Sequence, residues 1–516
     1  MQSLIELIKA VNVDKLKANG HWNSILEPGS LMDKLYNAIH EGKVKNNKEA
    51  AALIYPGQKG GAKLSNLIDR LKERLESVMF LLDFHASLNQ SDRQKAYFEC
   101  QRKWSIAMTL MTKNVRLAGI EVLEWVHKQS MFYEFTDLTL STLSILRLHY
   151  GTTQNAPGVY RKYRDEYQEY QEIFNLENEV EDRYTELVSI YSSGKVSKEN
   201  FVQLAEESYS RIAPYLKRYD SFKLHLSGRL MQLMLYSNKT DYRSTIKICK
   251  EAIAYFQSKP FVSYLPLQTF SYQMMVCYLK LGEFDNGNRI IQEYQDYFEE
   301  KSYNWYKMRE IYFLLAMHTR HYNEAFKICE ETMNVLKTGG QPEPIVEIWK
   351  IYNAYTYYLI HIGLIQPIDL KTAGFRMSKF LNETPMYSKD KQGMNVPIII
   401  IHILFSIANP RMYHALDQFE AIEKYCNRYL RKSELLRSNY FIKALLQIPV
   451  NSVMRESAIK KTRKYLDLLK NQPVGLPNQR ADLEVIPYEH LWEMVIESLK
   501  SPLRRQVPQI NLKSAA

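Results

Sequence analysis

The 516-residue chain contains little glycine and proline, and this shortage excludes two classes of structure. The 19 glycines and 18 prolines are about half and about two-thirds of ordinary usage. A turn-rich sandwich or barrel needs more of both residues, and disordered chains are normally enriched in them. The composition therefore favours helices, which exclude both residues from their interiors.

Sites of known chemistry are also scarce. The five cysteines lie far apart without a C-x-x-C pair, so a zinc site or a disulfide framework is disfavoured and we expect reduced core thiols. His318 and His321 have no recognisable third metal ligand, and we expect one to face the core and the other a turn. The segment 57–65 fails the phosphate-loop spacing, because its second glycine comes one position early and Leu64 replaces the Ser or Thr. We predict no catalytic residue, no metal, no cofactor and no enzymatic activity.

No apolar run is long enough to span a membrane. The longest, residues 396–408, has 13 residues and contains Pro397 and His402, whereas a spanning helix needs about 18 or more. We predict a buried helix there. The first 20 residues mix charged and apolar side chains and lack the pattern of a signal peptide. We therefore expect a cytoplasmic protein without membrane insertion.

Apolar residues recur at helical spacing along most of the chain. Between residues 64 and 82 they follow at steps of three, four and one, which predicts a helix. Between Tyr163 and Tyr191 they repeat at about 3.5 residues, with an interruption at Glu177, which predicts a long helix with an aromatic seam. These patterns predict an all-α protein.

The middle of the chain contains imperfect repeats. Residues 278–284 read Tyr-Leu-Lys-Leu-Gly-Glu-Phe and are followed by a small residue, Gly287. Weaker copies have Thr245 and Ala325 at the corresponding small position, 42 and 38 residues away. This pattern resembles the tetratricopeptide (TPR) repeat, although the regular period of that family is about 34. The resemblance implies a right-handed, TPR-like helical-repeat solenoid, preceded here by a helical N-terminal subdomain.

A second resemblance lies near the N-terminus. Ser30, with Asp33 three residues later, predicts a capped helix over 31–40, and further helices fit 48–54 and the segment from about 62. This arrangement resembles the helix-turn-helix subdomain of bacterial TPR-containing regulators that join a winged helix to a TPR domain. The resemblance implies DNA contacts from Lys63, Ser65, Asn66, Arg70 and Arg74. No strand-turn-strand wing follows Leu75, so a capping helical subdomain is the alternative.

These observations predict five regions: a helix-turn-helix-like subdomain (1–90), long helical hairpins (91–235), TPR-like repeats (236–425), basic C-terminal helices (426–500) and a flexible tail (501–516). Tyrosine is abundant, with 37 residues. The tyrosines fill helix contacts or line a peptide-binding groove. For the groove we nominate Tyr278, Arg309, Tyr312 and Tyr352.

Positive charge is concentrated near the C-terminus. Residues 428–470 contain eleven basic and three acidic residues, a net charge of +8 in a chain whose total is +11. Solvated helix faces often carry such charge; alternatively, the cluster binds an anionic partner. The candidates for that role are Arg428, Arg431, Lys432, Arg437, Lys460, Lys461, Arg463 and Lys464.

Together these patterns predict a non-catalytic cytoplasmic scaffold or adaptor that binds a protein or peptide on a TPR-like surface. The alternative is a nucleic-acid-associated regulator that binds DNA or RNA through the N-terminal helices, the basic C-terminal region, or both. Salt dependence of binding tests the alternative, because affinity for phosphates falls steeply with salt.

Overall fold

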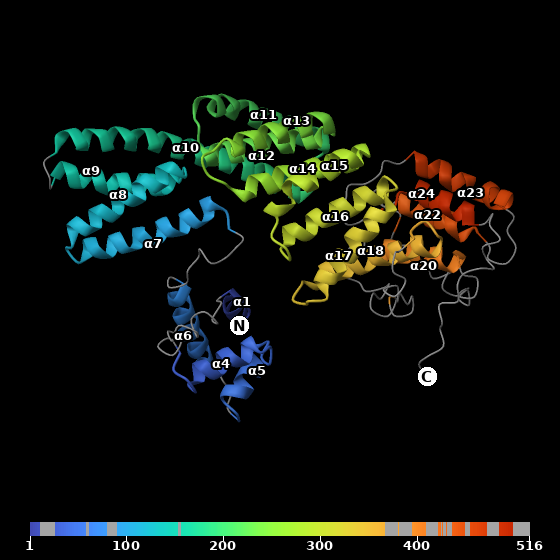
Figure 1. Ribbon diagram of the computed structural model, residues 1–516, viewed down its shortest axis with the longest axis horizontal. Coiled ribbons are helices and arrows are strands. Elements are labelled where there is room, and N and C mark those ends of the chain that lie inside the picture. Colours follow the sequence, from blue (N-terminus) through green and yellow to red (C-terminus); the bar gives the residue numbers. More distant parts are fainter. Residues whose placement is uncertain are drawn as a thin grey trace. The chain divides into compact units, whose positions relative to one another are not determined.

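The computed structural model describes residues 1–10, 26–57, 61–79, 90–152, 156–366, 380, 395–408, 422–424, 426, 430, 436–448, 455–471 and 484–498. Every regular element in these ranges is a helix (Figure 1). The all-α prediction is therefore confirmed for the described part of the chain. No helix within these ranges has both the length and the apolar character needed to cross a membrane.

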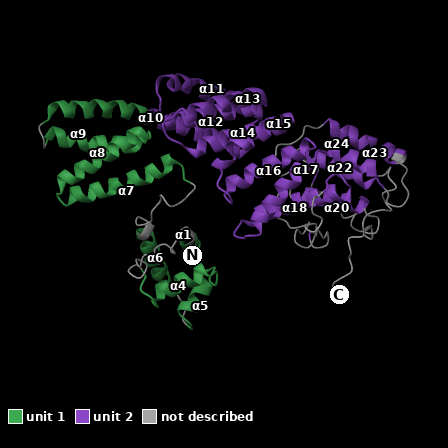
Figure 2. Ribbon diagram, viewed as in Figure 1, with its two compact units in different colours: residues 1–175 green, residues 176–516 purple. Residues whose placement is uncertain are grey.

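The chain divides into two compact units, residues 1–175 and residues 176–516 (Figure 2). The boundary falls inside one continuous helix, α10. The first unit contains α1 (Gln2–Ala10), α4 (Leu31–His40), α5 (Asn47–Ile54), α6 (Gly61–Met79), α7 (Asp92–Thr112), α8 (Arg116–Phe132), α9 (Thr136–Thr152) and the first half of α10 (Pro157–Ser193).

Helices α1, α4, α5 and α6 share a hydrophobic core of their own. Leu4, Leu35 and Leu71 are completely buried in it. The Ser30 side chain accepts a hydrogen bond from the Asp33 amide (3.2 Å), and α4 then runs over the predicted residues 31–40. The predicted helix over 48–54 is also present, beginning one residue earlier as α5. Local capping chemistry therefore sets the helix boundaries of this region.

The second unit begins with the remainder of α10. It continues with α11 (Lys198–Arg218), α12 (Phe222–Asn238), α13 (Tyr242–Gln257), α14 (Tyr264–Leu281), α15 (Phe284–Tyr294), the short 3-10 helix η2 (Gln295–Tyr297), α16 (Tyr303–His318), α17 (Tyr322–Leu336), α18 (Glu343–His361), α20 (Asn395–Ala408), α22 (Leu436–Leu446), α23 (Arg455–Lys470) and α24 (Tyr488–Ser498). From α11 to α18, each helix packs against its neighbour in sequence. The unit is thus a serial stack of helices, which continues through α20 to α22 and α24, with α23 packed on α22.

Small residues permit close crossing in this stack. A Cβ atom on Gly287, in α15, would lie only 2.2 Å from Cδ2 of Leu315 in α16. Thr245 and Ala325, at the corresponding positions of α13 and α17, are completely buried. The expected small residues therefore lie at tight helix contacts, where a larger side chain would force the helices apart.

The interruption at Glu177 in the long helix also has a structural explanation. Helix α10 is continuous from Pro157 to Ser193, and Val180 and Leu187 on its apolar seam are buried. Glu177 is buried as well, and its carboxylate accepts a 2.5 Å hydrogen bond from the hydroxyl of Ser221, the N-cap residue of α12. The polar residue therefore links α10 to the start of another helix.

The predicted core elements are buried. The apolar run 396–408 forms most of α20, and Ile398, Ile399, Ile400 and Ile401 have no exposed surface. All five cysteines are buried, and burial raises the pKa of the Cys100 thiol to about 12. These thiols therefore behave as small core side chains.

Candidate anionic-partner surface

Helix α23 presents a basic face to solvent. Ala458, Thr462 and Leu469 lie on its opposite face and are at most 1% exposed. The outward face carries exposed basic residues, and we name four that lie close together in the sequence the α23 basic surface: Lys460, Lys461, Arg463 and Lys464. The structure therefore brings together four of the eight basic residues nominated from the sequence.

The charges of this surface repel one another. Lys464 lies one helical turn from both Lys460 and Lys461, a spacing at which like charges cost about 0.2–0.5 kcal/mol per pair. Among the described residues, the ion pair recorded for this surface joins Arg463 to Asp467 across 3.9 Å, with Arg463 82% exposed. The α23 basic surface thus opposes the stability of its own helix and leaves its lysines available to a partner.

Arg437 does not belong to this surface, and its nomination as an anionic-partner residue is wrong. It lies on α22 with a side chain only 3% exposed. Its guanidinium contacts the Glu484 carboxylate at 2.5 Å and the Glu489 carboxylate at 2.9 Å. Burial alone would lower the pKa of Arg437, but the two carboxylates outweigh that effect and raise it. The arginine is therefore a paired cation inside the fold.

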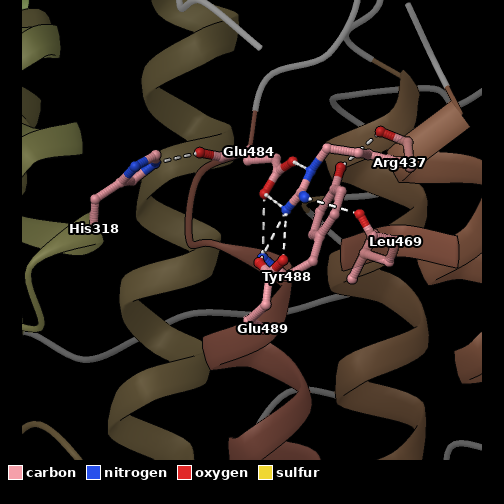
Figure 3. A network of polar contacts seen from close by, with 7 residues as sticks. His318, Arg437, Leu469, Glu484, Tyr488 and Glu489 are labelled. Atoms are coloured by element: carbon pink, nitrogen blue, oxygen red, sulfur yellow. Dashed lines mark hydrogen bonds and ion pairs between the residues drawn. The ribbon is translucent and has the colours of Figure 1, made fainter. Parts of the chain in front are cut away.

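The same ion pair joins the ends of two helices (Figure 3). Arg437 Nη1 donates to the carbonyl of Leu469 in the last turn of α23 (3.2 Å). The Glu484 carboxylate accepts from the amide of Tyr488, the first residue of α24 (3.2 Å). A cation at a helix C-terminus and an anion at a helix N-terminus both stabilise the helix dipole. The network therefore fixes where α23 ends and where α24 begins.

A histidine ties this network to α16. The Nε2 atom of His318 lies 2.7 Å from the carbonyl oxygen of Glu484. Burial lowers the pKa of His318 to about 4, so the ring is neutral at pH 7 and Nε2 carries the proton that it donates. Arg320 and Glu493 form a second, exposed link at 2.6 Å between the end of α16 and α24.

Sequence reasoning missed the carboxylate partners of Arg437. Glu484 and Glu489 lie 47 and 52 residues away, and no spacing rule connects residues so distant. A local signal was present, however. Arg437 shares its helix face with Phe441 and Ala444, which are completely buried, and a charge on such a face needs a buried partner. The nominated Arg428, Arg431 and Lys432 lie outside the described residues.

The groove nominated from the sequence is not a free surface. Tyr278, Tyr312 and Tyr352 are at most 5% exposed, so a partner cannot contact their rings in this fold. Tyr312 donates to Asn288 (2.8 Å), and Tyr352 donates to Glu310 (2.9 Å). These three tyrosines are therefore packing residues, and their nomination as groove residues is wrong.

Arg309, the fourth groove candidate, is also engaged within the stack. Its side chain is 15% exposed and pairs with Glu331 of α17 at 2.6 Å. It also donates to the Ile328 carbonyl (3.0 Å) and to the Thr332 hydroxyl (3.2 Å). This arginine connects α16 to α17 in the folded chain.

The residues nominated for DNA contact lie on one helix, α6. Its apolar residues Leu64, Ile68, Leu71 and Leu75 are buried, whereas the candidates Lys63, Ser65, Asn66, Arg70 and Arg74 are exposed. Acidic residues are interleaved with them on the exposed surface, including Asp69 and Glu73. These side chains are accessible, but the α6 surface is less uniformly basic than that of α23.

The two neighbouring histidines have separate surroundings. His318 points to Glu484, whereas the exposed His321 lies in the turn before α17, stacks on Phe284 with ring centroids 3.7 Å apart and contacts the Thr319 hydroxyl. The expected division between core and turn is confirmed. The described residues contain no cluster of three or more histidine, cysteine, aspartate or glutamate side chains with the arrangement of a metal site.

Comparisons with known proteins found no match for the chain. No protein-family model matches it, and neither the curated proteins nor the solved structures give a match.

Proposed function

We propose that the chain is a non-catalytic scaffold that binds an acidic protein partner through the α23 basic surface. The observation that carries the proposal is the exposure of Lys460, Lys461, Arg463 and Lys464 on a helix whose other face is buried. Positive side chains gathered on one rigid element attract acidic surfaces and steer their approach. The Arg437 network holds this helix by its last turn, so the backbone positions that carry the four charges keep a defined arrangement.

The architecture that we propose for the scaffold is a right-handed, TPR-like helical-repeat solenoid in the cytoplasm. The serial packing of α11–α18 supports this architecture, as do the buried small residues Thr245, Gly287 and Ala325 at equivalent positions. In such stacks each helical pair buries the apolar face of its neighbour, which leaves an extended surface for partners.

A direct test uses a fluorescein-labelled polyglutamate peptide and fluorescence anisotropy. We expect the full chain to bind the peptide and the variant Lys460→Glu/Lys464→Glu to lose at least about tenfold in affinity, because each reversal replaces an attraction by a repulsion. The variant Lys247→Glu/Lys250→Glu is the matched control, since it makes the same charge change at two exposed lysines of α13. Equal loss in both variants, or no binding by the unmodified chain, would overturn the proposal.

A nucleic-acid-associated role is the second candidate, favoured by the exposed residues of α6. Lys63, Arg70 and Arg74 fall on one side of that helix at spacings of seven and four residues. A duplex DNA probe distinguishes this function from the first. Tighter binding of DNA than of polyglutamate, lost in Lys63→Glu/Arg70→Glu and retained in Lys460→Glu/Lys464→Glu, would favour it.

A further inference from the structure

The helices that begin the second unit carry a charge opposite to that of α23. Residues 177–207 contain eight acidic and three basic residues, a net charge of −5. This segment comprises the end of α10 and the first half of α11. Its charge contrasts with α23, where residues 455–470 contain six basic and two acidic residues.

Three of these acids form a continuous face on α10. Glu179, Asp182 and Glu186 are exposed and follow at intervals of three and four residues, which places them on one side of the helix. Glu179 pairs with Arg183 at 3.0 Å, whereas no ion pair to Asp182 or Glu186 is found among the described residues. We name Glu179, Asp182 and Glu186 the α10 acidic face.

The two charged surfaces lie at opposite ends of one compact unit. Helix α10 shares a hydrophobic cluster with α11 and α12 at the start of the unit, and α22, α23 and α24 come last in the serial stack. Figure 2 shows α11 at one end of this unit and α23 at the other. A surface at one end of a molecule that matches a different surface at the other end favours heterologous, head-to-tail association between copies.

The spacing of the charges also matches. Lys461 and Lys464 are three residues apart, as are Glu179 and Asp182. Lys460 and Lys464 are four residues apart, as are Asp182 and Glu186. On both helices a four-residue step advances about 6 Å. Two such helices laid side by side can therefore form two ion pairs at once, with Lys460 and Lys464 of one helix facing Asp182 and Glu186 of the other.

We propose that the acidic partner of the α23 basic surface is a second copy of this chain, bound through its α10 acidic face. This inference rests on the proposed function and names its partner. Exposed ion pairs contribute only about 0–1 kcal/mol each, so the contact is weak and depends on salt. Because the two surfaces differ, a dimer formed in this way still has one free basic surface and one free acidic face. Further copies can therefore add to either end and form a filament, unless the assembly closes into a ring.

Sedimentation equilibrium of the full chain tests this proposal. At about 0.1 M salt the Debye length is about 10 Å, which damps repulsion between the net positive charges of two copies but preserves direct contacts. We expect the weight-average mass to rise above the 60.8 kDa of the monomer as protein concentration increases. At about 1 M salt, where the Debye length is about 3 Å, the mass should return to that of the monomer.

Charge reversal supplies the decisive control. The variants Lys460→Glu/Lys464→Glu and Asp182→Lys/Glu186→Lys should each be monomeric alone, because the two substituted side chains then have the same sign as the two that they would face. Mixed together they should associate, since the carboxylates introduced at positions 460 and 464 of one variant then face the ammonium groups introduced at positions 182 and 186 of the other. The control Lys247→Glu/Lys250→Glu should associate like the unmodified chain.

The outcomes separate this inference from the proposed function. A chain that binds polyglutamate but stays monomeric at every salt concentration contradicts self-association and leaves the acidic-partner function standing. Failure of the two reversed variants to associate when mixed would also reject the pairing of these two surfaces. A chain that associates equally at about 0.1 M and about 1 M salt uses a different interface.

Discussion

The Arg437 guanidinium lies 3.2 Å from the carbonyl oxygen of Leu469, so a buried residue of α22 stabilises the last turn of α23. The carbonyls of a final helical turn have no partner within their own helix. Arg437 satisfies one of them while its charge is balanced by Glu484. The exposed basic helix is therefore held from inside the fold.

Replacing this arginine should destabilise the second unit. In Arg437→Met the Glu484 carboxylate keeps its burial but loses its counter-charge, and breaking a buried pair in this way costs about 3–5 kcal/mol. Urea unfolding followed by circular dichroism measures the loss. The exposed residue Lys464 provides the control, since Lys464→Met should lower the free energy of unfolding by no more than about 0.5 kcal/mol. Similar midpoints for the two variants would show that the network contributes little.

Stability should also depend on pH through His318. The pKa of this side chain is about 4 in the folded chain, against 6.5 in its ordinary environment. As pH falls from 6.5 to about 4, the unfolded state takes up a proton that the folded state does not, so unfolding becomes easier. This group removes up to about 3 kcal/mol from the free energy of unfolding over that interval, and it contributes no change above pH 7.

The variant His318→Gln isolates this effect, because glutamine retains a neutral N–H donor for the Glu484 carbonyl. Its free energy of unfolding should fall less steeply between pH 6.5 and pH 4 than that of the unmodified chain. His321→Gln, in the adjacent turn, is the control for loss of a histidine. Parallel pH profiles for His318→Gln and the unmodified chain would contradict the assignment.

Two N-cap serines offer a matched comparison. Ser221 caps α12 and also donates to the buried Glu177, whereas Ser197 caps α11 in an exposed position. Ser197→Ala should cost about 1 kcal/mol, the ordinary value of a lost cap. Ser221→Ala should cost about 2–4 kcal/mol, because it also removes one hydrogen-bond donor from a buried carboxylate. Thermal unfolding of the two variants measures the difference, and equal shifts would mean that the Glu177 contact adds nothing.

Local signals predicted the helices well because the chemistry of a helix end is contained in a few residues. Ser30 and Asp33 fixed the start of α4, and the apolar spacing after Leu64 predicted α6. The boundary between the two units was not predictable in this way. It lies inside the continuous helix α10, where no proline or glycine marks it, and the interruption of the apolar repeat at Glu177 does not end the helix.

The candidate site was predicted in part, for a different reason. Exposure of Lys460 and Lys464 follows from the amphipathic pattern of α23. The count of basic residues along the sequence grouped Arg437 with these lysines. Its charge, however, is neutralised by carboxylates about 50 positions away. The prediction that tyrosines line a groove was wrong for a related reason. A helical stack buries aromatic residues at the same sequence spacing at which a groove would expose them.

The contacts between α16 and the segment that leads into α24 also bear on the order in which the chain folds. Neighbouring helices of the stack pair over short sequence distances, whereas His318 and Glu484 are separated by 166 positions. Closing a loop of that length costs about 4–5 kcal/mol in conformational entropy, and this cost precedes the stabilising contact between His318 and Glu484. Helices close in sequence can therefore pair early, and the junction that holds the basic helix is completed late, when both of its sides already exist.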